Sequence, residues 1–322
     1  MYWLGTDIGN DPALDGLWYI VAQATPVQMA DVQGIFAAAI TPRGKQGEID
    51  FGASFELVDL LASGGANGIA LFTGAGEYAA LAPDERSRLV YLAVKRSRIP
   101  VLVGVGSATL DDSVSLARAA RDAGAAGLLL PPPYFFRYEQ VDVHEFYQQF
   151  AAHVGAGAVT FLSNNPLYTT PIEVDTARAL IASGHFAGIE EASGDAQTFT
   201  CMKTASPCVL AGSDPFLPEA LRAGANGAVS GVAGALPELV VGLDRAIRGG
   251  KEGEAQELER NLRDFLAWCA EFPQPAALRV TAGMRGIKTG AHSAPLSTSK
   301  QKRMEEFQEW LQGWLPGVIV HR

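Results

Sequence analysis

The chain has 322 residues, of which 48% are hydrophobic and only 19% are charged, so it can bury a large core and hide much surface inside or between subunits. Its 25 Lys+Arg against 35 Asp+Glu give a net charge of −10, which argues against a nucleic-acid-binding protein, because phosphates need a basic surface. No apolar run approaches the roughly 18 residues of a membrane helix, and the acidic residues near the start do not fit a signal peptide. Three cysteines without metal-binding spacing fit a reducing compartment, so we expect an acidic, soluble, cytoplasmic protein.

Residues 1–33 mix aromatic and acidic residues without sustained periodicity, and we expect them to form an N-terminal extension. From Gly34 onward, short apolar runs alternate with helical patterns. Most runs are nearly continuous, which is typical of parallel strands covered on both faces. We therefore predict eight strands, at residues 34–41, 68–72, 100–105, 127–131, 158–163, 186–190, 207–212 and 227–230.

The segments between these strands carry helix signals. Residues 50–63 place apolar side chains at helical spacing, Pro83 suits a first helical turn, and Thr109 with Asp112 resembles a capping pair. Eight strands alternating with helices predict an α/β fold, a closed (βα)8 barrel over 34–249. Residues 250–322 are expected to add a helical segment, with three helices packed on the barrel. Further barrel helices are expected at 139–153, 172–183, 215–223 and 236–248.

The segment from Gly74 to Ala79 matches the G-x-G-x-x-A pattern of dinucleotide-binding proteins. That pattern requires a helix starting at the glycines and an acidic residue closing the next strand, and neither is expected here. Two interpretations remain: a tight turn that needs a flexible backbone, or a turn whose N–H groups hold an anion.

The sequence contains no complete metal-binding motif. His144-Glu145 begins an H-E-x-x-H-like pattern, but Gln148 occupies the second histidine position. We therefore expect no metal and no cofactor.

Glu190 and Glu191 end an apolar strand at the C-terminal mouth of the predicted barrel, where active sites gather. A carboxylate in that position is either functional or neutralised by a structural partner. No arginine falls at a neighbouring strand end, so an ion pair is not evident from the sequence.

A set of motifs in the same order as the strands resembles the dihydrodipicolinate synthase / N-acetylneuraminate lyase family over roughly residues 34–316. The motifs are Thr41-Pro42, Gly76-Glu77, Pro132-Pro133-Tyr134, Asn164 with Pro166, Gly188-Ile189-x-Glu191-Ala192-x-Gly194, Gly212-Ser213-Asp214 and Gly227-Ala228-Val229-Ser230. Ala294-Pro295-Leu296 also resembles the closing helix of that family.

The resemblance implies a (βα)8 lyase in which a lysine on the sixth strand forms a Schiff base with a 2-oxo acid. Here Glu190 stands at the lysine position, and a carboxylate cannot form an imine. Ser163 corresponds to the catalytic tyrosine, Tyr168 to a carboxylate-binding arginine and Phe135 to a proton-relaying tyrosine. Gly74 and Ala75 replace two threonines.

These departures disfavour a dianionic substrate and tolerate a neutral or cationic one. Our first hypothesis is a divergent lyase, of aldolase or dehydratase type, that acts on a small carbonyl or hydroxy compound. Its expected catalytic residues are Glu190 as acid or base, with Ser163 and Tyr168, and the substrate-binding residues are Gly74, Ala75, Gly76, Tyr134 and Val229.

The second hypothesis is a catalytically silent barrel that binds a metabolite or a protein partner. A Schiff base on another lysine is a further alternative, but Lys203 and Lys288 do not map to strand ends. The low charge content and the resemblance also predict a homodimer or homotetramer.

Overall fold

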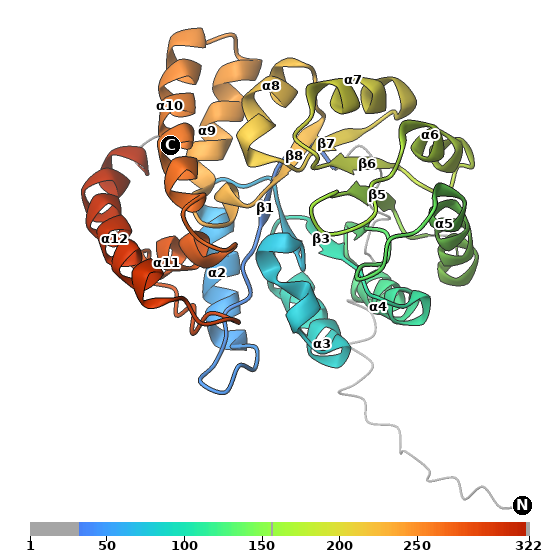
Figure 1. The fold of residues 1–322 in the computed structure, drawn as a ribbon, viewed down its shortest axis with the longest axis horizontal. Helices are drawn as coiled ribbons and strands as arrows, with labels where there is room; N and C mark the ends of the chain where they lie inside the picture. The colour runs from blue at the N-terminus through green and yellow to red at the C-terminus, as the bar shows by residue number, and fades with distance from the viewer. Residues whose placement is uncertain (1–31, 156, 320–322) are drawn as a thin grey trace, which may run out of the picture.

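A computed structural model describes residues 32–155 and 157–319 and confirms the closed parallel barrel (Figure 1). Apart from Val32 and Gln33, the predicted extension 1–33 lies outside the described residues. Each strand pairs with its neighbour in sequence, and β8 pairs with β1 to close the barrel. The strands are β1 (Gly34–Ala38), β2 (Gly68–Leu71), β3 (Val101–Gly104), β4 (Gly127–Leu130), β5 (Thr160–Asn164), β6 (Gly188–Glu191), β7 (Val209–Ala211) and β8 (Gly227–Ser230).

All eight predicted strands are present, but most are shorter than the apolar runs from which they are predicted. β1 ends at Ala38, whereas its run continues to residue 41. Ala39 and Ile40 remain buried after the strand has ended, because the first residues of the loops are covered at the barrel mouth. Hydrophobicity therefore locates the strands well but places the ends of β1, β2, β3, β4 and β7 too late and the starts of β5 and β6 too early.

The helices of the barrel form a ring around the strands (Figure 1). Local signals explain several ends: the Asp50 side chain caps α2, Pro83 occupies the first turn of α3, and the Thr109 hydroxyl accepts from the Asp112 N–H at the start of α4. The helices are α2 (Phe51–Ser63), α3 (Pro83–Arg96), α4 (Leu110–Ala123), α5 (Gln140–Val154), α6 (Val174–Ala182), α7 (Ala196–Ala205), α8 (Leu217–Arg222) and α9 (Pro237–Arg248).

The predicted C-terminal segment forms three helices, α10 (Glu252–Cys269), α11 (Ala276–Met284) and α12 (Thr298–Val318). Figure 1 shows α10 beside α9 and α12 on the outside of the molecule. Aromatic side chains join α10 to α12, with Phe265 stacked on Trp314 at 5.8 Å between ring centroids. The prediction for Ala294-Pro295-Leu296 is wrong in one respect: these residues precede α12 in a loop, because the Ser297 side chain caps the helix. Among the described helices, none is both long and apolar enough to cross a bilayer.

Candidate active site

Glu190 lies inside the barrel beside Ser163. The register of β5 and β6 pairs these two residues directly. The Ser163 hydroxyl donates to Glu190 Oε2 at 2.6 Å, and only 7% of Glu190 is exposed. Two of the three predicted catalytic residues are thus in direct contact.

Burial raises the pKa of Glu190 to about 7, because the charged carboxylate loses its hydration. The Ser163 hydroxyl lowers this pKa by donating to the charged form, and the neighbouring charge of Glu191 raises it. Within the described ranges, no cation contributes to the pKa of Glu190. A carboxyl group in this state can both accept and donate a proton near neutral pH.

Glu191 is a different kind of group, although it adjoins Glu190. Successive side chains of a strand point to opposite faces, so Glu191 lies on the outer face of β6. Its carboxylate accepts from Asn164 Nδ2 and from the Ser193 N–H, both at 2.7 Å. Burial raises its pKa, and these donors lower it. Glu191 is therefore a hydrogen-bonded structural residue, and Glu190 alone faces the inside of the barrel.

Two adjoining cavities open above Glu190. The outer cavity, of about 360 Å³, is lined by Glu190, Tyr168, Gly74, Ala75 and Val229, among others. The inner cavity, of about 40 Å³, is lined by Glu190, Ser163 and Tyr168. The structure thus brings together all three predicted catalytic residues and three of the predicted substrate-binding residues.

Two glycines, Gly212 and Gly74, make room for the side chains of Glu190 and Tyr168. A Cβ on Gly212 would lie 2.9 Å from Glu190 Oε1, and a Cβ on Gly74 would lie 3.1 Å from the Tyr168 ring. Any larger residue at Gly212 would therefore displace the Glu190 carboxylate.

Gly76 and Tyr134 do not line either cavity. The Gly76 N–H donates to the Thr73 carbonyl at 3.0 Å, and its carbonyl accepts from the Thr41 hydroxyl at 2.8 Å. The Tyr134 ring packs edge-on against Tyr78, with 5.7 Å between centroids. Gly76 therefore stabilises the turn through its backbone hydrogen bonds, and Tyr134 packs against Tyr78, which lines the inner cavity.

Thr73 and Tyr78 line the inner cavity, and the sequence interpretation missed both. Burial raises the pKa of Tyr78 to about 12, and the charges of Tyr134, Tyr168 and Glu190 also raise it, while Arg86 lowers it. Arg86 lies 5.3 Å from the Tyr78 ring centroid. Their position in the sequence could have indicated them, because both residues flank the Gly74–Gly76 turn that follows β2. Functional groups of such barrels lie at the C-terminal ends of the strands.

Among residues 32–155 and 157–319, no group of three or more His, Cys, Asp or Glu residues is placed to hold a metal ion.

The model of the dihydrodipicolinate synthetase family matches residues 31–313, nearly the whole described chain. The chain belongs to this family. It is 34% identical to the 4-hydroxy-tetrahydrodipicolinate synthase of Salinibacter ruber over 73% of this chain and 81% of that protein. It is 27% identical to an uncharacterized DapA-like lyase of Halobacterium salinarum over 82% of this chain and 88% of that protein. The structure of dihydrodipicolinate synthase from Aquifex aeolicus matches with a TM-score of 0.82 and 25% identity, over 88% of this chain and 98% of that one.

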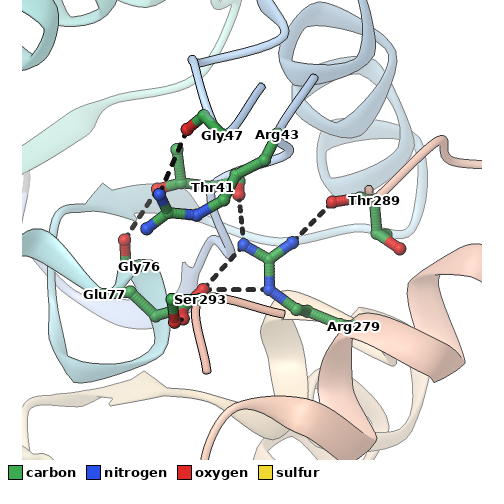
Figure 2. Close-up of polar contacts among 8 residues, drawn as sticks. All are labelled: Thr41, Arg43, Gly47, Gly76, Glu77, Arg279, Thr289 and Ser293. Carbon is green, nitrogen blue, oxygen red and sulfur yellow. Dashed lines mark hydrogen bonds and ion pairs between the residues drawn. The ribbon is translucent and has the colours of Figure 1, made fainter. Parts of the chain in front are cut away.

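In this member of the dihydrodipicolinate synthetase family, a buried ion pair holds the loop after β2. Arg279 of α11 donates to Glu77 Oε2 through Nε at 2.9 Å and through Nη2 at 2.6 Å (Figure 2). The same guanidinium donates to the Thr41 carbonyl at 2.6 Å and to the Thr289 carbonyl, and the Ser293 hydroxyl donates to Glu77. Glu77 has a φ of 53°, a left-handed conformation that is uncommon for a residue with a side chain. The ion pair therefore fixes an unusual backbone next to the Gly74–Gly76 turn.

Proposed function

We propose that this chain is a lyase of the aldolase or dehydratase type, acting on a small carbonyl or hydroxy compound. Glu190 is its general acid and base, and no Schiff base forms at the sixth strand. The observation that carries this proposal is the state of Glu190: buried, hydrogen-bonded by Ser163, facing a cavity, and with its pKa raised to about 7.

Such a group can carry out both reaction types. In a retro-aldol cleavage, the Glu190 carboxylate takes the proton of a β-hydroxyl group, and the bond between the α and β carbons breaks. The electron pair passes to the carbonyl oxygen as an enolate, and the proton then moves from Glu190 to the α carbon. In a dehydration, the carboxylate removes the α proton, and the hydroxyl leaves with that proton as water. The N–H groups of Gly74 and Ala75 are the donors proposed to hold the developing oxyanion, and Tyr168 and Ser163 are proposed to orient the substrate.

The proposal places Glu190 at the position of the Schiff-base lysine of the family. Two observations support it: Glu190 pairs with Ser163 and Leu210 in the barrel register, and no lysine of the described chain lines either cavity. Lys203 lies on α7 with its ammonium 3.5 Å from Asn226 Oδ1, and Lys288 follows α11 in a loop. The lysine closest to the motif is thus engaged outside the barrel.

We further propose a cytoplasmic homodimer or homotetramer. Phe135 and Phe136, which are 85% and 65% exposed, lie after β4 on the side of the site. Exposed aromatic groups of this size are typical of surfaces that a second subunit covers. A monomer in light scattering at micromolar protein concentration would contradict this part of the proposal.

A thermal-shift screen with 2-oxo acids, sugar acids and amino compounds tests the proposed function, since a bound ligand stabilises the folded state. We expect hits among neutral or amine-bearing compounds, and we expect each hit to weaken in Glu190→Gln and to be cleaved or dehydrated by the unaltered protein. Ligands that bind without any chemical change would instead support a catalytically silent binding protein.

A further inference from the structure

The two cavities above Glu190 form one continuous site with two chemically different chambers. Thr73, Gly74, Asn165, Tyr168 and Glu190 line both of them. A ligand that contacts Glu190 can therefore place a head group in the inner chamber and the rest of the molecule in the outer one.

The inner chamber is small and rich in hydroxyl groups. Its volume of about 40 Å³ suits a head group of roughly two or three non-hydrogen atoms, given that one water needs about 10–15 Å³. Ser163, Thr73, Tyr78 and Tyr168 line this chamber together with Glu190, beside the apolar Phe72, Leu129 and Pro131. The Thr73 hydroxyl is buried and has no hydrogen-bond partner within the described chain. Because a buried unpaired hydroxyl is unfavourable, this group is suited to bind an oxygen or N–H of a ligand.

The outer chamber has an apolar wall that the C-terminal segment supplies. Leu266 and Cys269 of α10, Phe272 of the following loop and Leu278 of α11 line it. Burial raises the pKa of Cys269 to about 12, so its thiol stays protonated and uncharged. The Tyr168 hydroxyl donates to Gln274 Oε1 at 3.2 Å and so joins this wall to the loop after β5.

Neither chamber offers a cation to an acidic ligand. Over the described ranges, no lysine, arginine or histidine lines them. The charged side chains that do line them are Glu190 and Asp214, and the Asp214 oxygens accept from the Ser230 hydroxyl and the Val232 N–H. Arg279 is committed to Glu77 on the other side of the turn. A ligand carboxylate would lose its hydration here without gaining a partner.

From these features we infer that the site takes an uncharged ligand with a carbonyl or hydroxyl head in the inner chamber and an apolar tail, about the size of a phenyl ring, against Leu266, Cys269, Phe272 and Leu278. The inference rests on the proposed function, since it names the substrate class of that site. The inferred site differs from a site for small acids because its ligand has an apolar tail and carries no charge.

Three matched β-hydroxy ketones test this inference by calorimetric titration of the full chain. They are the aldol of benzaldehyde with acetone, the aldol of acetaldehyde with acetone, which lacks the tail, and the aldol of benzaldehyde with pyruvate, which adds a carboxylate. We expect the first to bind at least about tenfold more tightly than either of the others, as expected from burial of an aromatic ring. Equal binding of the two acetone aldols, tightest binding of the pyruvate aldol, or binding of none of them overturns the inference.

Variants then locate the two parts of the ligand. Leu266→Asn should reduce binding of the two benzaldehyde aldols and leave that of the acetaldehyde–acetone aldol unchanged, whereas Thr73→Val should weaken both acetone aldols by the same factor. Tyr91→Ala, an exposed substitution on α3, is the control and should change neither. If Leu266→Asn unfolds, Cys269→Arg serves instead and should shift the preference toward the pyruvate aldol. A folded variant at the apolar wall that leaves the order of affinities unchanged contradicts the inference.

Release of benzaldehyde, followed by its ultraviolet absorbance, separates the inference from the proposed function. Tight binding of the benzaldehyde–acetone aldol with neither release of benzaldehyde nor formation of the dehydrated enone supports the ligand class and contradicts the lyase. Cleavage of both acetone aldols with equal kcat/KM supports the lyase and contradicts the apolar tail.

Discussion

Two carboxylates at the mouth of the barrel are both buried, and their surroundings are opposite. Glu77 has a side chain that is 9% exposed and is paired with Arg279, which is 1% exposed, at 2.6 Å. Glu190 is 7% exposed and receives one hydroxyl donor, Ser163. Glu77 lies in the loop after β2, where α11 reaches the barrel, whereas Glu190 lies on β6 and lines both cavities.

This comparison separates a structural carboxylate from a functional one. An ion pair with several hydrogen bonds holds the Glu77 side chain and fixes the loop, so removing Arg279 would leave a buried carboxylate without its cation. Glu190 has no such compensation among the described residues, and its burial makes the charged form unfavourable. A buried carboxyl group without a cation does not stabilise the fold. The raised pKa that results from it is what a general acid or base needs near neutral pH.

The largest expected effect follows from removing the cation at Glu77. Arg279→Met should lower the free energy of unfolding by about 3–5 kcal/mol, because it leaves the Glu77 carboxylate buried and unpaired. Urea denaturation measures this loss. The control is Arg96→Met, which breaks an exposed ion pair with Asp59 and should cost about 0–1 kcal/mol. Equal effects of the two substitutions would contradict a structural role for Arg279.

The next largest effect is a gain in stability from Glu190→Gln, and its size depends on pH. The folded-state pKa of Glu190 lies above its ordinary value of 4.5, so below that value both states are protonated and the residue costs nothing. As pH rises to about 7 the unfolded state ionises first, and the folded protein loses about 3 kcal/mol, given about 1.4 kcal/mol per pKa unit. Glu190→Gln should therefore raise Tm by about 3–6 °C at pH 8 and leave it unchanged near pH 4.5.

Glu191→Gln is the matched control for that experiment. The Glu191 carboxylate accepts from Asn164 and Ser193, and an amide would present a donor to one of them, so we expect a lower Tm. A sharp fall of Tm in Glu190→Gln at pH 8, with ligand binding unchanged, would show that Glu190 is structural.

Ser163→Ala is expected to have a smaller effect on the same group. The hydroxyl donates to the charged carboxylate and lowers the pKa of Glu190, so its loss should raise that pKa by about one further unit. The midpoint of the pH-dependent Tm difference between Ser163→Ala and Ser163→Ala with Glu190→Gln reports this shift. A midpoint that moves to lower pH would contradict the assigned hydrogen bond.

The smallest expected effect is the absence of a covalent adduct. Incubation with pyruvate and borohydride should leave the mass of the protein unchanged, because Glu190 cannot form an imine. Glu190→Lys should form at most a small amount of adduct, since Ser163 lacks the phenol of a tyrosine. A mass gain that maps to any lysine of the unaltered protein would overturn the proposed chemistry.

The sequence predicted the barrel because each strand and helix carries its own local signal, such as the apolar run of β6 or the cap at Thr109. Glu190 was predictable for the same reason, as a charge inside an apolar run. The ion pair was not, because Arg279 and Glu77 are 202 residues apart and no local pattern links them. Thr73 and Tyr78 were missed because the direction of a side chain in a turn is set by tertiary contacts, such as the packing of Tyr78 against Tyr134 and Arg86.

Infrared titration of Glu190 tests the central claim most directly. The carbonyl band of a protonated carboxyl group is recorded from pH 4 to pH 9 for the unaltered protein and for Glu190→Gln, and the difference isolates the one residue. We predict a band that disappears with a midpoint near pH 7, as expected for a buried carboxyl group with one hydroxyl donor and no ion pair. A midpoint at or below the ordinary value of 4.5 would show a charge-stabilised carboxylate and would contradict Glu190 as the acid and base of this site.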